Sequence, residues 1–386
     1  MPTTGGRRVA RGLAWTSVEI WARQLLQALS FVLLARLLSP EAWGTVGIAL
    51  VFVSAATLLV AQGGWVPALV RAPELSADLE DTVFWTAMAV ASVLAAALIV
   101  GADVLAGWFA APGVAPVLRV MSLAILFEAL GVVPRARLLR RMGFAGLAAR
   151  SLVGVAAGGV AGVGLALAGY GFWGLVAYQL LQPVAEALVL IFFSSWRPGG
   201  NVSRDALRAV VAFLGHVAGE RVCALVDTQL PRLLLGHLLG PAALGIFTVA
   251  RRVADLGAEL VAIPVGRVSF PIFARTNADP ERLRASLTLS VTGVAGMALP
   301  AFLGLAVLAP DLVPLVLGAH WSEAVRTVQI GVLVGPAMGL AAILRALLLA
   351  TGDGRALFWL GIGGATRTGP LVFPPAPPCA FAPLGN

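Results

Sequence analysis

The chain of 386 residues is 59% hydrophobic and 12% charged, with a mean hydropathy of +0.92. Soluble domains carry about 25% charged residues, so this composition excludes a soluble protein and predicts an integral membrane protein. The net charge of +8 does not indicate nucleic-acid binding, because the arginines are spread between apolar segments and form no patch.

The first apolar segment, residues 13–35, is long enough to span a membrane but carries polar groups. Glu19, Arg23 and Gln27 follow one another at steps of four, which places them on one face of a helix. An ionised side chain at the bilayer centre costs about 2.5–3.5 kcal/mol on insertion scales. We therefore expect this face to point into a helical bundle and not into lipid.

Nine further segments reach the roughly 20 apolar residues that a membrane span requires. The ten predicted spans are 13–35, 43–63, 83–105, 116–134, 151–169, 172–193, 209–231, 242–266, 285–308 and 326–350. The fold class that follows is an all-α, polytopic membrane protein.

The distribution of arginine between the spans predicts the orientation of the chain. Fourteen arginines lie on one side, at positions 7, 8, 11, 135, 137, 140, 141, 150, 197, 204, 208, 275, 282 and 284, whereas the loops 36–42, 106–115, 170–171 and 309–325 contain only Arg36. Cytoplasmic loops carry an excess of Lys and Arg. We therefore expect both chain ends in the cytoplasm.

The chain contains an internal repeat with an offset of 201 positions. Residues 33–44 (LLARLLSPEAWG) align without a gap on residues 234–245 (LLGHLLGPAALG), with seven of twelve positions identical, and Glu19 aligns on Glu220. Six spans separate the copies, so both run in the same direction and are parallel repeats of the kind found in transporters. This predicts two pseudo-symmetric helical lobes, residues 1–200 with six helices and residues 201–352 with four, so that the second is incomplete.

The C-terminal segment, residues 353–386, does not continue the pattern of spans. Six prolines fall within residues 370–383, a density that no spanning helix tolerates. One interpretation is a disordered, proline-rich tail. The other, which we favour because the second lobe stops four spans into six, is that the reading frame is lost near residues 361–366.

Further polar residues lie inside the predicted spans. They are Glu128 in the fourth span, Gln182 and Glu186 in the sixth, Glu220, Arg221 and Asp227 in the seventh, and Arg251 and Asp255 in the eighth. Two interpretations are open: neutralising pairs such as Glu19–Arg23 and Arg251–Asp255 hold the bundle together, or the set lines a water-filled translocation cavity. For the set as a whole we favour the cavity, because charge facing lipid on so many spans is too costly.

The sequence offers little for soluble enzyme chemistry, cofactors or metals. The loops between spans are too short for a catalytic domain, and the chain has no Walker, GxSxG or HExxH motif. Its three histidines and two cysteines have no metal-ligand spacing. We therefore expect no enzyme activity and no cofactor or metal.

Four segments carry a resemblance to a known family. They are LLARLLSPEAWG (33–44), QGGWVPALVRAPELSADLEDTVFW (62–85), GYGFWGLVAYQLL (169–181) and FFSSWRPG (192–199). Together they resemble the polysaccharide biosynthesis, or oligosaccharide flippase (Wzx-type), branch of the multidrug/oligosaccharidyl-lipid/polysaccharide exporter superfamily. Members of that family usually have twelve to fourteen spans, so the chain resembles a C-terminally truncated member.

The resemblance implies a bacterial inner-membrane flippase that carries lipid-linked oligosaccharide by alternating access, for surface polysaccharide such as lipopolysaccharide, O-antigen or exopolysaccharide. It implies the bilayer and, further, polysaccharide-assembly proteins as partners, and it makes no prediction of oligomeric state. Arg23, Arg221 and Arg251 are expected to pair with the pyrophosphate. Glu19, Glu128, Glu220 and Asp255 are expected to orient these arginines or to couple transport to H⁺ or Na⁺.

Three alternatives stay open from the sequence. A multidrug exporter or a lipid II exporter belongs to the same superfamily. A membrane enzyme such as a glycan polymerase or ligase typically has a large periplasmic loop, and no loop between the predicted spans exceeds about 20 residues. The third is a non-functional truncated fragment that inserts into the membrane but transports nothing.

Overall fold

The computed structural model of the chain describes residues 4–62, 64–72, 74–276, 279–333 and 335–351, and their regular structure is helical. The chain forms two compact units, Met1–Gly245 and Ile246–Asn386, which we describe separately. The predicted lobes at 1–200 and 201–352 refer to sequence repeats, and that division stays a prediction. The predicted tail, 353–386, lies outside the described residues.

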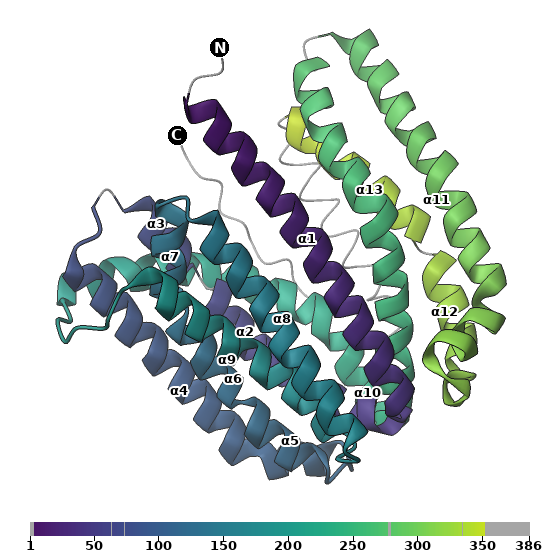
Figure 1. Cartoon of the computed structure of the whole chain (residues 1–386), viewed down its shortest axis with the longest axis horizontal. Coiled ribbons are helices and arrows are strands. Elements are labelled where there is room, and N and C mark those ends of the chain that lie inside the picture. Colours follow the sequence, from purple (N-terminus) through teal and green to yellow (C-terminus); the bar gives the residue numbers. More distant parts are fainter. Residues whose placement is uncertain (1–3, 63, 73, 277–278, 334, 352–386) are drawn as a thin grey trace. The chain divides into compact units, whose positions relative to one another are not determined.

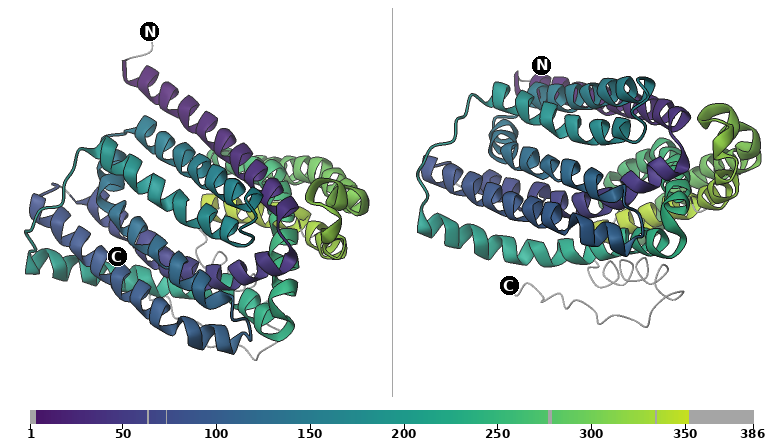
Figure 2. Two further views of the ribbon diagram at one scale, coloured as in Figure 1. Left: turned by 60° about the horizontal axis from the view of Figure 1, so that its bottom comes forward. Right: turned by 90° about the horizontal axis from the view of Figure 1, so that it is seen from below.

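The first unit consists of nine helices and the first part of a tenth. They are α1 (Thr4–Leu37), α2 (Pro40–Gln62), α3 (Trp65–Arg71), α4 (Ala77–Trp108), α5 (Val114–Met121), α6 (Leu123–Leu130), α7 (Val132–Arg140), α8 (Phe144–Leu167), α9 (Trp173–Ser194) and α10 (Arg204–Thr276). Helix α8 packs along α9 and against α1, while α4 packs against α5 and α6 (Figures 1 and 2).

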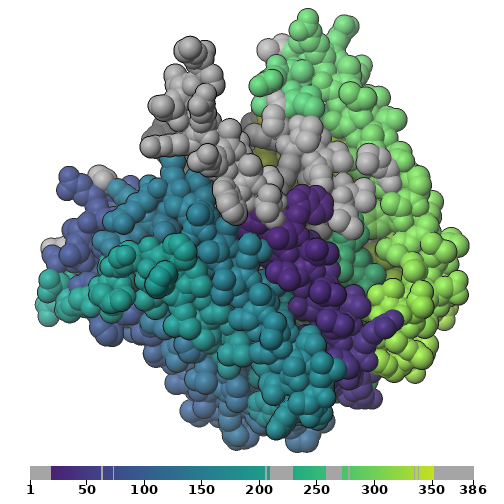
Figure 3. Space-filling view, in the orientation of Figure 1, coloured from purple at the N-terminus to yellow at the C-terminus, as the bar shows by residue number. Residues whose placement is uncertain are grey.

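The surface of this unit is apolar over long stretches, as lipid contact requires. Val100 of α4, Val160 of α8 and Phe192 of α9 are each at least 77% exposed. Figure 3 shows α8 and α9 at the surface of the first unit. Because exposed apolar patches of this extent are rare on soluble monomers, the surface agrees with a membrane protein.

In its described residues, the second unit contains the rest of α10 and three more α-helices. These are α11 (Pro280–Leu317), α12 (Ala324–Leu333) and α13 (Gly335–Thr351), with a 3₁₀ turn η1 (Ala319–Trp321) after α11. Phe302 and Trp321 are almost fully buried in this unit. A Cβ added at Gly335 would collide with the Phe302 ring, so the glycine lets α13 approach α11 closely.

Nine helical segments within the described residues are long and apolar enough to cross a membrane. They match nine of the ten predicted spans in order, which confirms the all-α, polytopic membrane fold. The remaining one, 209–231, has helical backbone within α10, but most of its side chains lie outside the described residues.

The predicted fourth span, 116–134, differs from expectation because it is three short helices in place of one. Helix α5 joins α6 at Ser122, and α6 joins α7 at Gly131. The Ser122 hydroxyl donates to the Leu118 carbonyl at 2.6 Å, which competes with the regular backbone pattern. The apolar length of the segment predicts the crossing correctly but gives no signal for these joins.

Helix α10 is broken at Gly240, which aligns with Ser39 in the first copy of the repeat. Gly240 has φ 82° and ψ 176°, which are not helical values and which suit glycine. At the equivalent position in the first repeat, Ser39 lies between the end of α1 and the start of α2. Both repeats therefore consist of a long helix, a break and a second helix that begins with proline.

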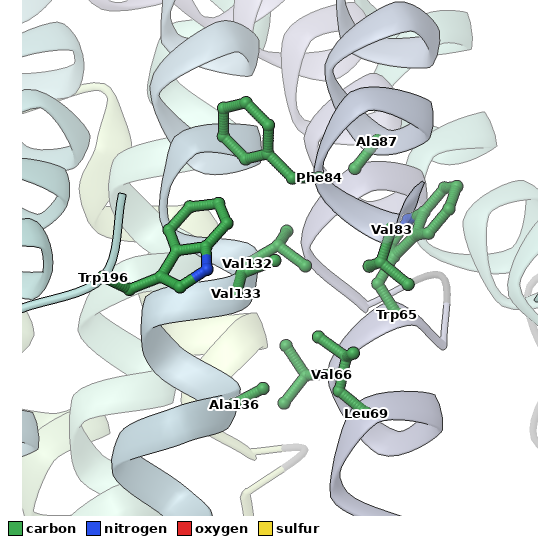
Figure 4. Packing of buried hydrophobic residues seen from close by; sticks show 10 residues of the cluster. All are labelled: Trp65, Val66, Leu69, Val83, Phe84, Ala87, Val132, Val133, Ala136 and Trp196. Carbon is green, nitrogen blue, oxygen red and sulfur yellow. The ribbon is translucent and has the colours of Figure 1, made fainter. Parts of the chain in front are cut away.

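Two of the family-like segments, 62–85 and 192–199, meet in a hydrophobic cluster at one end of the first unit. Its buried members are Trp65, Val66, Leu69, Val83, Phe84, Ala87, Val132, Val133, Ala136 and Trp196 (Figure 4). The rings of Phe84 and Trp196 meet edge to face with centroids 5.2 Å apart. These segments therefore contribute packing to the first unit.

Buried polar contacts fix the same end of the unit. Asp81 accepts hydrogen bonds from the backbone N–H groups of Gly199 at 2.9 Å and Asn201 at 3.3 Å. The Nε of Arg137 donates to Glu80 at 2.7 Å. Glu80 and Asp81 are 3% and 4% exposed. Since buried charges need such partners, this network ties the start of α4 to the connection between α9 and α10.

Candidate functional site

Part of the predicted site gathers around Glu186 of α9. Arg150 of α8 donates from Nε to Oε2 of Glu186 at 2.6 Å, and its Nη2 contacts the same oxygen. The side-chain amide of Gln182 donates to Oε1 at 3.1 Å. Glu186 is 8% exposed. Gln182 and Glu186, four residues apart, therefore share one face of α9, and both oxygens of the carboxylate have donors.

A glycine on the neighbouring helix makes room for this carboxylate. A Cβ added at Gly154 of α8 would collide with Cγ of Glu186. Gly154 lies four residues after Arg150, so both residues face α9 from the same side of α8. The arrangement follows from a sequence in which arginine and glycine share one face of α8 while glutamine and glutamate share one face of α9.

The cluster borders a small cavity. Its lining consists of Ala61, Val66, Phe127, Glu128, Gly131, Val132, Arg135, Arg150, Pro183, Glu186, Ala187 and Leu190. The cavity has about 10 Å³, which is the room that one water molecule requires. It therefore has space for water or a small ion and none for a sugar.

Two carboxylates and two guanidinium groups line this cavity and balance in formal charge. Glu128 of α6 interacts electrostatically with Glu186, Arg150 and Arg135 of α7. Among the described residues, the Glu128 carboxylate has no hydrogen-bond or ion-pair partner at direct contact distance. The Glu128 carboxylate is therefore the acidic group of the cluster that is open to a bound water or cation.

Residues 135 and 150 were expected in the loop after the fourth span, and the structure places them in helices instead, while the expected cytoplasmic side stays a prediction. Arg135 lies in α7 and Arg150 in α8, and both line the cavity. One sequence signal for Arg150 exists, namely its position one turn before Gly154 at the start of an apolar, glycine-rich segment.

The predicted residues of α1 lie together on one face of that helix. Glu19, Arg23 and Gln27 are all half-buried. Deeper along the same helix, Ser30 is buried against Gly159 of α8. The helix is thus packed on one side against the first unit, in agreement with the expectation that it belongs to a bundle.

The remaining predicted residues belong to α10. Glu220, Arg221 and Asp227 lie in its helical backbone, and their side chains are outside the described part of the chain. In the second unit, Arg251 Nε donates to Asp255 at 2.9 Å, which confirms that pair. A single cavity shared by the α1, α9 and α10 residues stays a prediction.

A polar contact between α2 and α10 was missed from the sequence. The side-chain amide of Gln229 donates to the Ser54 hydroxyl at 2.8 Å, and Arg232 approaches the Gln229 oxygen at 3.5 Å. These residues lie within candidate membrane spans. The contact joins the second helix of one repeat to the first helix of the other.

Comparison with known proteins identifies the family of this chain. The family described as polysaccharide biosynthesis protein matches residues 33–326. The chain belongs to this family.

Two curated relatives of this polysaccharide biosynthesis protein are named for similar processes. The succinoglycan biosynthesis transport protein ExoT of Rhizobium meliloti (strain 1021) is 29% identical over 377 residues, which cover 95% of this chain and 74% of ExoT. The lipopolysaccharide biosynthesis protein WzxC of Escherichia coli (strain K12) is 25% identical over 334 residues, which cover 84% of this chain and 66% of WzxC. The chain therefore spans between 66% and 74% of the length of these relatives.

Solved structures show the same fold. The lipid II flippase MurJ in an inward closed conformation matches with a TM-score of 0.72 at 14% identity, covering 90% of this chain and 78% of MurJ. An inward-facing multidrug resistance transporter of the MATE family, in the MOP superfamily, matches with a TM-score of 0.54 at 15% identity. The match covers 88% of this chain and 86% of the transporter. At these identities the similarity concerns the fold.

Proposed function

We propose that the protein is a bacterial inner-membrane flippase that translocates lipid-linked oligosaccharide for the biosynthesis of a surface polysaccharide. Membership of the polysaccharide biosynthesis family over residues 33–326 is the observation that supports this most directly. The transporter fold, similar to MurJ and MATE structures, supports translocation by alternating access. The relatives ExoT and WzxC are named for succinoglycan and lipopolysaccharide biosynthesis, which favours exopolysaccharide or lipopolysaccharide as the product.

The anionic headgroup of the substrate is assigned to intramembrane arginines outside the small cavity. The cavity of about 10 Å³ has room for about one water molecule, so we place the headgroup elsewhere. Arg23, Arg221 and Arg251 are the proposed partners of the pyrophosphate, because a guanidinium group can bind phosphate oxygens in a bidentate manner. Glu19 and Asp255 then orient Arg23 and Arg251, since each lies four residues away on the same helix.

Glu128 is the proposed site of coupling to H⁺ or Na⁺. Its carboxylate borders a cavity the size of one water molecule and has no direct partner among the described residues. Fluorescence of the ten tryptophans would be followed while the purified protein is titrated with Na⁺ at constant ionic strength, and separately with acid. A saturable response to one ion that is lost in Glu128→Gln supports the assignment. A wild-type protein that responds to neither ion contradicts it.

In the proposed orientation both chain ends are cytoplasmic, because the loops predicted on that side carry most of the arginines. Polysaccharide-assembly proteins are the proposed partners. Reporter fusions at residues 38 and 200 test the orientation, since these positions are expected on opposite sides of the membrane.

The function is tested in a bacterial host that lacks its own oligosaccharide flippase. The full chain is expected to restore surface polysaccharide, and Arg23→Ala to abolish the restoration, while Arg23→Lys retains part of it. Arg141→Ala is the matched control, because Arg141 is exposed in the turn between α7 and α8. Resistance to cationic dyes would identify a multidrug exporter, and rescue of cells depleted of their lipid II flippase would identify a lipid II exporter. A chain that reaches the membrane and does none of these is a non-functional fragment.

A further inference from the structure

The two copies of the internal repeat touch each other through equivalent residues. A Cβ added at Gly44 would overlap the carbonyl oxygen of Pro241, and a Cβ added at Gly245 would overlap the carbonyl oxygen of Pro40. Pro40 and Pro241 are equivalent at the offset of 201 positions, as are Gly44 and Gly245. The contact is therefore reciprocal, as a two-fold pseudo-symmetry axis passing between the glycines requires.

The contact is made by backbone atoms at the beginnings of two helices. A Cβ at Gly245 would also lie 3.0 Å from the Gly44 nitrogen, so neither position has space for a side chain. Backbone surfaces that meet without interlocking side chains are held by close packing and by weak Cα–H···O contacts.

Additional contacts hold the same end of α10 against the first repeat. The His237 ring stacks on Trp108 with centroids 4.7 Å apart, and its Nδ1 lies 3.1 Å from the Trp108 carbonyl oxygen. A Cβ at Gly236 would touch Phe109 and Ile48 at 3.3 and 3.4 Å. The arginine distribution predicts that the breaks at Ser39 and Gly240 and the connection after Trp108 face the non-cytoplasmic side of the membrane.

From the reciprocal contact we infer that Gly44, Gly245 and the carbonyls of Pro40 and Pro241 form the outer gate of the transporter, closed in this conformation. The inference rests on the proposed alternating access. The Ser54–Gln229 hydrogen bond lies ten residues further along α2, about 15 Å deeper at 1.5 Å per residue. Opening the gate separates the Pro–Gly contacts and exposes this polar layer to the outside.

A side chain at either glycine penalises only the closed state, because only there does the carbonyl oppose it. A ligand or substitution shifts a two-state equilibrium by its differential effect on the two states. Gly44→Ala and Gly245→Ala are therefore both expected to populate the outward-open state. Gly101→Ala and Gly164→Ala are matched controls in other membrane helices, since a Cβ at either position meets nothing within 4 Å.

The test measures access to a cysteine behind the gate. The full chain carries Ser54→Cys with Cys223→Ser and Cys379→Ser, and spheroplasts are labelled with a membrane-impermeant maleimide. Because the added methyl group overpacks only the closed state, labelling is expected to become about tenfold faster in Gly44→Ala and in Gly245→Ala. The Gly101→Ala and Gly164→Ala controls are expected to label at the parent rate.

An unchanged labelling rate in folded Gly44→Ala and Gly245→Ala overturns the inference, as does an equal increase in the controls. If both gate variants are missing from the membrane while the controls are present, the Pro–Gly contact is required for folding, and the gate inference is overturned as well. Labelling requires no transport, so the result is separate from the polysaccharide test. Gating without restored polysaccharide would contradict the proposed function and leave the gate in place.

Discussion

Replacing Glu186 with methionine would leave the Arg150 guanidinium buried without its carboxylate. The Arg150 side chain is 19% exposed and the Glu186 side chain 11% exposed, so the pair is largely removed from solvent. Breaking a buried pair by removing one partner destabilises by about 3–5 kcal/mol, whereas replacing both partners with apolar residues is often neutral. Methionine is the suitable replacement because its Cγ is unbranched, as is the Glu186 Cγ that packs against Gly154.

The reasoning is tested with a double-mutant cycle of Glu186→Met and Arg150→Met. Unfolding of the purified protein in SDS would be followed by tryptophan fluorescence. Each single variant is expected to lose about 3–5 kcal/mol of unfolding free energy, and the double variant about 1 kcal/mol or less. Single variants that lose less than this, or a double variant that loses the sum of both, would refute the view that each charge is buried chiefly on account of the other.

Three other substitutions address packing and buried polar groups. Gly154→Ala should lower the unfolding free energy by about 1–3 kcal/mol through overpacking, while Gly164→Ala on the same helix, with open space at its Cβ, should not lower it. Asp81→Ala should lower the unfolding free energy by about 1–3 kcal/mol, because the backbone N–H groups of two residues lose their acceptor. Asp78→Ala is the control, because Asp78 is exposed. Equal losses of unfolding free energy in both variants would contradict the assignment. Phe302→Ala should lose about 3–5 kcal/mol as measured by the same SDS unfolding, and a smaller loss would mean that the second unit can close around the cavity.

The membrane fold could be predicted because the length of the apolar segments reports it directly. The same holds for contacts within one helix, such as Gln182 with Glu186 and Arg251 with Asp255, since helical spacing fixes them. The break at Gly240 was also accessible, through the alignment of the two repeats.

Contacts between distant segments could not be predicted, because nothing in the local sequence specifies the partner. Asp81 and Gly199 are 118 residues apart, and Arg150 and Glu186 are 36 residues apart. Arg135 and Arg150 satisfy the arginine bias of a cytoplasmic loop equally well whether they face water or a cavity. The division of the fourth span into α5, α6 and α7 depends on how those helices pack against α2, α4 and α9.

The kinds of contact in the molecule fit the proposed mechanism. Within the first unit, helices are joined by buried side-chain networks such as Asp81 with Gly199 and Arg150 with Glu186, which are costly to break. Between the two repeats, the closest approach is of Gly44 to the backbone of Pro241, next to side-chain contacts of Gln229 with Ser54 and His237 with Trp108. Alternating access requires parts that stay rigid and contacts between them that separate readily. Rigidity is therefore assigned to the buried ion pairs and hydrogen bonds within the first repeat, and movement to the Pro–Gly contact together with the weaker contacts beside it.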